Sequence, residues 1–195
     1  MNNKFFTFIK PYLTFIDHGH LYRKPFSWLY TLIAIVNLLV PIYIFYTAVD
    51  NHIFSSPAKF IIVFSLVWII IALASWISFQ LWWDRKEKVN ATSIKGDEFV
   101  ATPVIAHLIQ TLGEWAGTWI AIVGFFVTLT ITIILGDEGY YLTHQIGLGI
   151  RMTGYVFAFL MPIYGFLIIA GSRFVAEQCR ALSSIANNTR KNENK

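Results

Sequence analysis

The sequence predicts an all-α integral membrane protein built as a four-transmembrane-helix bundle, and three observations lead to this fold class. Hydrophobic residues make up 56% of the 195-residue chain and charged residues only 13%, with a mean hydropathy of +0.57. Average soluble domains are about 45–50% apolar and about 25% charged, so the excess apolar surface points to lipid. Four uncharged stretches and a one-sided distribution of basic residues complete the argument.

The four uncharged stretches are each long enough to cross a bilayer. They cover residues 25–49, 60–83, 115–136 and 152–172. None of these stretches contains Asp, Glu, Lys or Arg. A spanning helix needs about 20 largely apolar residues, and lipid offers no partner for backbone polar groups outside the segment itself. We therefore expect each stretch to form a helix.

The basic residues divide unequally between the segments that join these helices. Thirteen of the fifteen lysines and arginines lie in the N-terminal segment, the middle loop and the C-terminal tail, and the two hairpin loops carry only Lys59 and Arg151. The positive-inside rule places the basic segments in the cytoplasm. The predicted topology therefore has both termini inside, and an even number of spans agrees with it.

These boundaries divide the chain into five parts. They are a cytoplasmic interfacial segment (1–25), a first transmembrane hairpin (26–83), a cytoplasmic loop with an amphipathic lead-in (84–114), a second transmembrane hairpin (115–172) and a cytoplasmic tail helix with a frayed end (173–195). Apolar and aromatic residues crowd the first part together with lysines, which favours an amphipathic segment on the membrane surface. A helix packed under the bundle would use the same residues.

The two hairpins share a common plan. Residues 32–50, LIAIVNLLVPIYIFYTAVD, align without a gap to residues 119–137, WIAIVGFFVTLTITIILGD, with an Ile-Ala-Ile-Val block and a closing aspartate in both. Each half also has a lead-in with a proline, a span out, a short loop and a span back. The plan predicts two parallel hairpin repeats, a kind of symmetry that membrane proteins use. Lipid restricts the residue types strongly, so the identities alone do not establish a duplication.

Four polar residues form a candidate interfacial cluster on the cytoplasmic side: His18, His20, His107 and Glu114. Histidine and carboxylate together are ligands that metal ions prefer, so a metal or quinone-type site is one interpretation. Their spacing matches no closed metal motif, and the other interpretation is a set of solvated interfacial side chains. We predict no metal and no cofactor, and no nucleophile motif identifies a catalytic residue.

Within the spans, Asn37 is the strongest polar residue, and Pro41 and Pro162 are the helix-bending residues. Asn37 is expected to make a hydrogen bond between helices; a contact with a ligand or pore is the alternative. Proline removes a backbone hydrogen bond and its ring clashes with the preceding turn, so each proline should bend its helix. In a transporter, these residues and Thr128 would line the path.

Small residues recur every four positions near the third and fourth spans. They are Gly113, Gly117 and Ala121 in the third and Gly154 and Ala158 in the fourth. Such ridges let helices approach closely in a membrane. Because a short loop joins these two spans, we expect them to pack as an antiparallel hairpin; a homodimer face is the rival interpretation.

The second half of the chain carries a set of residues at its two ends. Phe99 and Pro103 stand in the lead-in, and the tail holds Arg173, Glu177, Ile185, Ala186 and Asn188. A Phe and Pro lead-in, a helix hairpin and an Arg, Glu and Ile-Ala-x-Asn tail make this half resemble small bacterial multi-pass membrane domains of unknown function. The resemblance covers about half of the chain. It implies the bacterial cytoplasmic (inner) membrane as location, and it implies no activity.

Three functional hypotheses follow. The first is a non-enzymatic scaffold, assembly or regulatory subunit whose partners are the lipid bilayer and other proteins or a second copy, because ionisable residues that mark ion and proton pathways are missing from the spans. The second is a small transporter or pore for a neutral or apolar solute. The third is a membrane enzyme that uses the interfacial histidines. The modest net charge of +4 does not imply nucleic acid, and no small-molecule ligand is assignable.

Overall fold

The computed structural model describes residue 10 and residues 20–90, 101–139 and 154–193, and within these ranges the regular structure is entirely helical. In chain order the elements are α3 (His20–Asp50), the short 3₁₀ helix η1 (Ile53–Ser55), α4 (Ala58–Asn90), α5 (Ala101–Trp119), the π-helix η2 (Ile120–Gly124), α6 (Phe125–Ile134) and α8 (Tyr155–Glu193). For this part of the chain, the prediction of an all-helical fold is confirmed.

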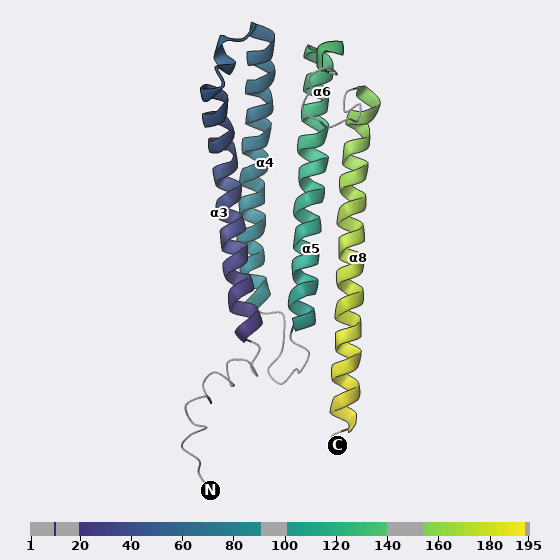
Figure 1. Ribbon diagram of the computed structural model, residues 1–195. Helices are drawn as coiled ribbons and strands as arrows, with labels where there is room; N and C mark the ends of the chain where they lie inside the picture. The colour runs from purple at the N-terminus through teal and green to yellow at the C-terminus, as the bar shows by residue number, and fades with distance from the viewer. Residues whose placement is uncertain (1–9, 11–19, 91–100, 140–153, 194–195) are drawn as a thin grey trace.

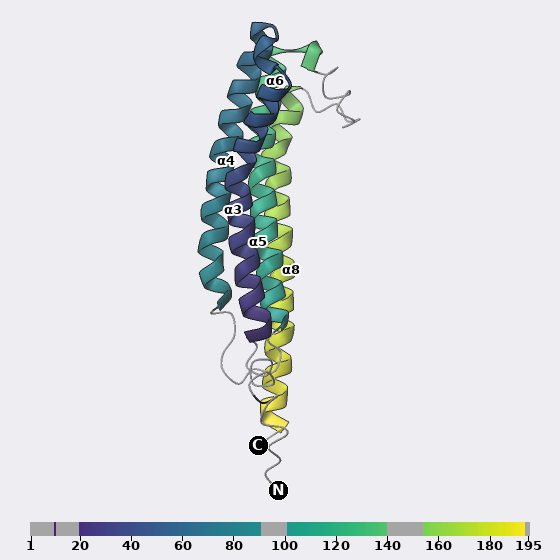
Figure 2. The ribbon, with the colours of Figure 1, turned by 60° about the vertical axis from the view of Figure 1, so that its left-hand side comes forward.

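The long helices stand side by side and alternate in direction (Figure 1, Figure 2). Helix α3 packs along α4, and the continuous helix formed by α5, η2 and α6 packs along α8. The two pairs meet mainly where α4 contacts α5, η2 and α6. The start of α3 and the end of α8 lie at the same end of the bundle, which is the lower end in Figure 1.

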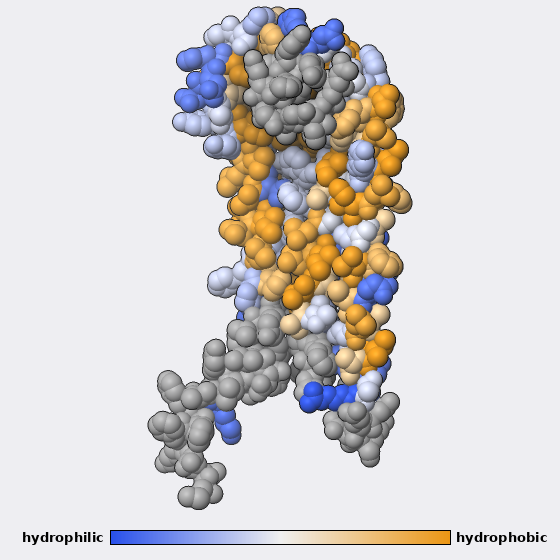
Figure 3. Space-filling view, turned by 45° about the vertical axis from the view of Figure 1, so that its right-hand side comes forward, coloured by the Kyte–Doolittle hydropathy of each residue, from blue (hydrophilic) through white to orange (hydrophobic). Residues whose placement is uncertain are grey.

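All four helical columns are long and apolar enough to cross a membrane. The candidate segments are Lys24–Asp50, Ala58–Val89, Ala101–Ile134 and Tyr155–Arg190. Figure 3 shows apolar side chains as a broad orange belt on the face in view. Large side chains such as Phe166, Phe159 and Ile133 are more than half exposed. Soluble monomers rarely expose large continuous apolar patches, so this surface fits lipid better than water.

An uncharged section of the bundle lies between two layers of charged side chains. At the upper end in Figure 1, Lys59 of α4 pairs with Glu138, which follows α6. At the lower end, Arg85 of α4 pairs with Glu114 of α5. Lys59 and Arg85 are 26 residues apart in one helix, which corresponds to about 39 Å at 1.5 Å per residue. This separation suits a hydrocarbon core of about 30 Å with the charges just outside it.

The helices extend further at the lower end than the uncharged stretches predicted. The segment 84–114, expected to be a loop with an amphipathic lead-in, is helical in its described part, because α4 runs to Asn90 and α5 continues from Ala101 into the third span without interruption. Pro103 does not stop α5, since it lies in the first turn, where backbone donors have no partner within the helix. The expected interfacial segment 1–25 lies mostly outside the described residues, and from His20 onward it belongs to α3.

Helices α5 and α8 approach each other through glycine. A Cβ atom at Gly117 would lie 2.5 Å from the carbonyl oxygen of Gly165, and a Cβ atom at Gly113 would overlap the side chain of Ser172. Ala121 also lies against Gly165. Backbone therefore meets backbone at this interface, and the ridge of small residues on α5 contacts α8 of the same chain.

The partner ridge on α8 differs from the one that the sequence interpretation chose. Gly154 precedes α8, has a φ of 123° and would have open space around a Cβ atom, so it serves the turn that leads into the helix. Glycine adopts such positive φ values without strain. Ala158 is fully buried. Because α8 begins only at Tyr155, the antiparallel pairing brings Gly165 opposite Gly117.

The continuous helix formed by α5, η2 and α6 contains one wide turn. Residues Ile120–Gly124 form the π-helix η2, and they contain the Ile-Ala-Ile-Val block of the second hairpin. The corresponding block at 33–36 lies in the regular α-helix α3. π-Helical turns are rare and occur mostly as single wide turns inside α-helices. Gly124 faces α8 here, since a Cβ atom would lie 2.9 Å from the sulfur of Met161. At this block, the backbones of the two hairpins therefore differ.

Helices α3 and α4 pack through large side chains. Tyr30 and Trp82 are fully buried and meet edge to face, with ring centroids 5.0 Å apart. Higher in the bundle, the Trp68 Nε1 donates to the carbonyl oxygen of Pro41 at 2.9 Å, and the Trp68 ring lies next to Phe45. Aromatic side chains therefore lie between these two helices at two levels of the bundle.

Candidate functional site

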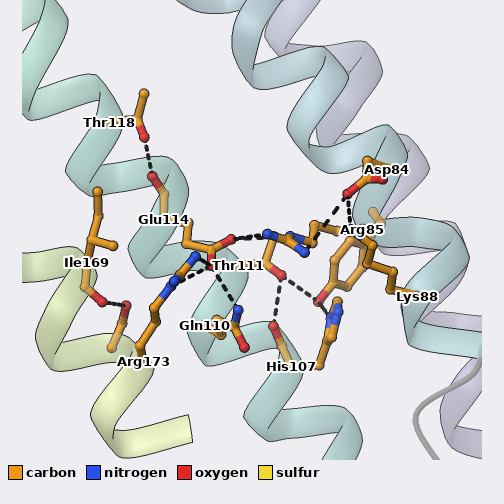
Figure 4. Close-up of polar contacts among 12 residues, drawn as sticks. Asp84, Arg85, Lys88, His107, Gln110, Thr111, Glu114, Thr118, Ile169 and Arg173 are labelled. Atoms are coloured by element: carbon orange, nitrogen blue, oxygen red, sulfur yellow. Dashed lines mark hydrogen bonds and ion pairs between the residues drawn. The ribbon is translucent and has the colours of Figure 1, made fainter.

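Glu114 lies at the centre of a polar cluster at the lower end of the bundle (Figure 4). Its side chain on α5 is only 6% exposed, and arginines from two neighbouring helices reach it. The Arg85 Nη2 on α4 donates to Oε2 at 2.8 Å. The Arg173 Nε on α8 donates to Oε1 at 2.9 Å. Hydrogen bonds between charged partners are roughly twice as strong as neutral ones, so this carboxylate joins three helices.

The cluster extends to both sides of Glu114. One turn earlier on α5, Gln110 donates to Glu114 Oε1 at 2.8 Å and accepts from Arg180 of α8 at 2.5 Å. On α4, the Asp84 carboxylate lies 3.9 Å from Arg85 and accepts from Lys88 at 2.7 Å. The result is a continuous network of polar contacts from α8 across α5 to α4.

A second polar group lies on the same face of α5. The hydroxyl oxygen of Tyr30 on α3 is 2.9 Å from Nδ1 of His107 and 3.4 Å from Oγ1 of Thr111. Thr111 in turn donates to the carbonyl oxygen of His107. His107, Thr111 and Glu114 follow each other at intervals of four and three residues, which places them on one face of a helix. All three are buried, so this face of α5 contacts α3, α4 and α8.

Polar side chains inside the uncharged section also join helices. Asn37 of α3 is 4% exposed; its Oδ1 accepts from the Trp115 Nε1 at 3.1 Å, and its Nδ2 donates to the carbonyl oxygen of Ile33. Ser78 of α4 accepts from the Trp119 Nε1 at 2.5 Å. Asn37 therefore makes a hydrogen bond between α3 and α5, which is the kind of contact that the sequence favoured for it.

The residues considered for a transport path lie in different environments. Asn37 and Thr128 are buried, whereas Pro162 is exposed on α8. The carbonyl oxygen of Pro41 accepts the hydrogen bond from Trp68. Pro162 therefore lies on the outside of the bundle, away from the buried side chain of Asn37, and the four residues do not share one interior surface.

The four residues considered for a metal or quinone-type site are not brought together by any described contact. His18 lies outside the described residues, and His20 is the first residue of α3. His107 contacts Tyr30, and Glu114 contacts the two arginines. Within the ranges that the structure describes, no group of three His, Cys, Asp or Glu side chains could hold a metal ion.

The sequence interpretation missed the partners of Glu114 and of His107. A signal for the first pair existed: Arg85 and Arg173 lie within two residues of the ends of uncharged stretches, and Glu114 directly precedes another. Three helices therefore place charge at the same depth. For Tyr30 and His107 there was no such signal, because their contact depends on how α3 and α5 are rotated.

The fold and the site together define a bundle of long apolar helices whose buried polar side chains bind one another. Comparisons of the chain with protein-family models, with curated proteins and with solved structures give no match.

Proposed function

We propose that this is a multi-pass protein of the bacterial cytoplasmic membrane, with both termini in the cytoplasm, that acts as a non-enzymatic scaffold, assembly or regulatory subunit. One observation carries the functional part of the proposal: the strongest polar side chains in the bundle, Glu114 and Asn37, bind side chains of other helices. Glu114 joins α4, α5 and α8, and Asn37 joins α3 and α5. Side chains used in this way stabilise a fixed arrangement of helices.

The proposed orientation is supported by the two charged layers and by the uneven basic residues. Arg85, Arg173 and Arg180 all lie toward the end of the bundle at which α3 begins and α8 ends. Of the lysines and arginines among the described residues, only Lys59 lies at the opposite end. Under the positive-inside rule, the arginine-rich end faces the cytoplasm.

Cysteine labelling in intact cells tests this orientation. Cys179 is the only cysteine, so Cys179→Ser gives a background for Asn51→Cys in the upper loop and Asn188→Cys near the end of α8. Both asparagines are exposed. We expect a membrane-impermeant maleimide added from outside to label the first variant and to label the second only after lysis. Labelling of Asn188→Cys in intact cells would overturn the orientation.

A candidate partner surface lies on the cytoplasmic part of α8. Leu182 and Ile185 are 67% and 62% exposed. They follow Arg173 by 9 and 12 residues in α8, which places them about 14–18 Å beyond the level of Glu114. Apolar side chains exposed at this distance from the belt lie past the lipid tails, where a protein contact would cover them.

Affinity purification in mild detergent tests the scaffold role. We expect the full chain to retain a defined set of membrane proteins, and a variant with Leu182→Glu and Ile185→Glu to lose them. Ser184→Glu is the matched control, since Ser184 is also exposed on α8 but lies on another side of the helix. A chain that stays a solitary monomer, or that moves a solute across liposomes, would contradict the proposal. In the flux assay, Asn37→Leu shows whether any transport depends on the bundle interior.

A further inference from the structure

Within the part of the chain that the structure describes, the arginines at the cytoplasmic end of the bundle are not fully matched by carboxylates. Arg85 and Arg173 share the single carboxylate of Glu114. The contact described for Arg180 is to the neutral amide oxygen of Gln110, and no carboxylate of the described residues forms an ion pair with it. Glu177 lies between Arg173 and Arg180 on α8 and is exposed.

Counting the charges of this group gives a positive excess. Three guanidinium groups stand against the carboxylates of Glu114 and Glu177, while Asp84 is occupied by Lys88 and lies 3.9 Å from Arg85. Among these described residues, one positive charge remains. A monoanionic group bound between Arg173 and Arg180 would neutralise it, and guanidinium groups bind phosphate oxygens through paired hydrogen bonds.

The depth of Arg173 and Arg180 along α8 indicates which kind of anion they would bind. Arg173 follows the last uncharged stretch of α8, and its side chain is 53% exposed. Arg180 lies seven residues further on, and side chains on a helix lean toward its N-terminus, so the guanidinium of Arg180 points back toward the membrane side. Its contact with Gln110, one turn from Glu114, shows this direction. Both arginines thus reach the depth of lipid phosphates.

We propose that Arg173 and Arg180 bind the phosphodiester headgroup of an anionic phospholipid of the cytoplasmic leaflet at the α5–α8 interface. This inference rests on the membrane orientation proposed above. The exposed side chain of Phe166, two turns before Arg173 on the same side of α8, lies on the membrane side of Arg173, where the acyl chains of such a lipid would run. Basic pockets between membrane helices on the cytoplasmic side are known to take anionic headgroups.

Arg180 is the residue to substitute. Its partner Gln110 is neutral, so the fold should tolerate the loss of Arg180 better than the loss of Arg173, which pairs with Glu114. The full chain is purified in a neutral detergent, and binding of phosphatidylglycerol and phosphatidylcholine is measured by native mass spectrometry. We expect phosphatidylglycerol to bind more tightly, and Arg180→Gln to weaken this preference about fivefold. Arg180→Lys should restore most of it. Lys86→Gln is the matched control, since Lys86 on α4 lies over the Trp83 ring at 4.6 Å.

A second variant tests the charge count in the opposite direction. Glu177→Gln removes an opposing carboxylate and should strengthen binding of phosphatidylglycerol. Equal binding of the two lipids, or equal losses in Arg180→Gln and Lys86→Gln, would overturn the proposal. Inorganic phosphate that competes as well as the lipid would overturn the choice of a lipid over a free anion. A chain that binds phosphatidylglycerol but retains no protein partner leaves this inference standing and removes the scaffold role.

Discussion

The two helix pairs of this protein solve the same packing problem in opposite ways. Between α5 and α8, Gly117 and Gly165 bring backbone against backbone. Between α3 and α4, the rings of Tyr30 and Trp82 meet edge to face. Lipid tails are as apolar as the helices, so helix association in a membrane depends on packing and on hydrogen bonds. The first pair uses close packing, and the second uses aromatic side chains and their hydrogen bonds.

This difference predicts which helix pair tolerates substitutions. A glycine in contact with backbone has no room to adjust, because a main chain cannot choose another rotamer. An aromatic side chain keeps most of its contacts when one polar atom is removed. We therefore expect the α5–α8 pair to be sensitive to the addition of single atoms and the α3–α4 pair to be comparatively robust.

The largest effect is expected for Gly165→Ala in α8. Its new Cβ would overlap the carbonyl oxygen of Gly117, so the helices must separate, at about 3 kcal/mol. Gly171→Ala in the same helix is the control, because nothing lies within 4 Å of a Cβ there; it should stabilise by about 0.5–1 kcal/mol. Thermal unfolding in detergent measures both. Equal melting temperatures for the two variants would show that the α5–α8 contact at Gly165 is not sensitive to an added atom.

The next effect is expected for Glu114→Gln, which tests the contact that joins the two pairs. The amide cannot neutralise Arg85, whose side chain is 21% exposed, and an unmatched charge that is partly buried costs about 2 kcal/mol. Denaturant unfolding in detergent micelles checks this value. Glu177→Gln, an exposed change of the same kind, is the control and should be close to neutral. A Glu114→Gln variant as stable as this control would show that the cluster does not hold the pairs together.

A smaller effect is expected for Tyr30→Phe in the α3–α4 pair. The ring stays against Trp82, and the hydrogen bonds of the hydroxyl to His107 and Thr111 of α5 are lost, which amounts to about 1 kcal/mol. Tyr43→Phe serves for comparison, since Tyr43 is 70% exposed. Melting temperatures of the two variants give the answer. A loss at Tyr30 as large as that at Gly165 would mean that the aromatic pair is as intolerant as the glycine pair.

The smallest effect is expected for Trp68→Phe. It removes the hydrogen bond to the carbonyl oxygen of Pro41 and keeps a ring next to Phe45; hydrogen bonds within membranes contribute on average about 0.6 kcal/mol. Trp76→Phe is the reference, because the Trp76 ring is 52% exposed and stacks on Phe79. Unfolding followed by circular dichroism is sufficient. A loss above about 2 kcal/mol would place Trp68 among the residues that determine the fold.

Sequence reasoning was strongest for features that depend on local composition. The four helices follow from uncharged stretches of sufficient length, and the contact of Gly113 and Gly117 with another helix follows from their spacing of four. Asn37 was expected to bond to a neighbouring helix because a buried amide in an apolar segment needs a partner. The helix ends were less accurate, since polar residues near Ala101 continue the same helix beyond the apolar section.

The remaining features depend on how helices are rotated and shifted against one another. The partner of Gly117 is Gly165, because the start of α8 determines which residues face each other. Glu114 binds two arginines that are 29 and 59 residues away in sequence. Their places at the ends of the uncharged stretches indicate a shared depth, but the pairing itself depends on the rotation of the three helices.

The wide turn η2 has a consequence for how this chain can change over generations. A π-turn holds one residue more than an α-turn, so the loss of one residue within Ile120–Gly124 can be absorbed by conversion to a regular helix. The loss of one residue in the first copy of the block, at 33–36 of the regular helix α3, would instead rotate every following side chain by about 100°. The deletion of one residue should therefore be tolerated in the second copy of the Ile-Ala-Ile-Val block, within Ile120–Gly124. It should not be tolerated in the first copy, at 33–36.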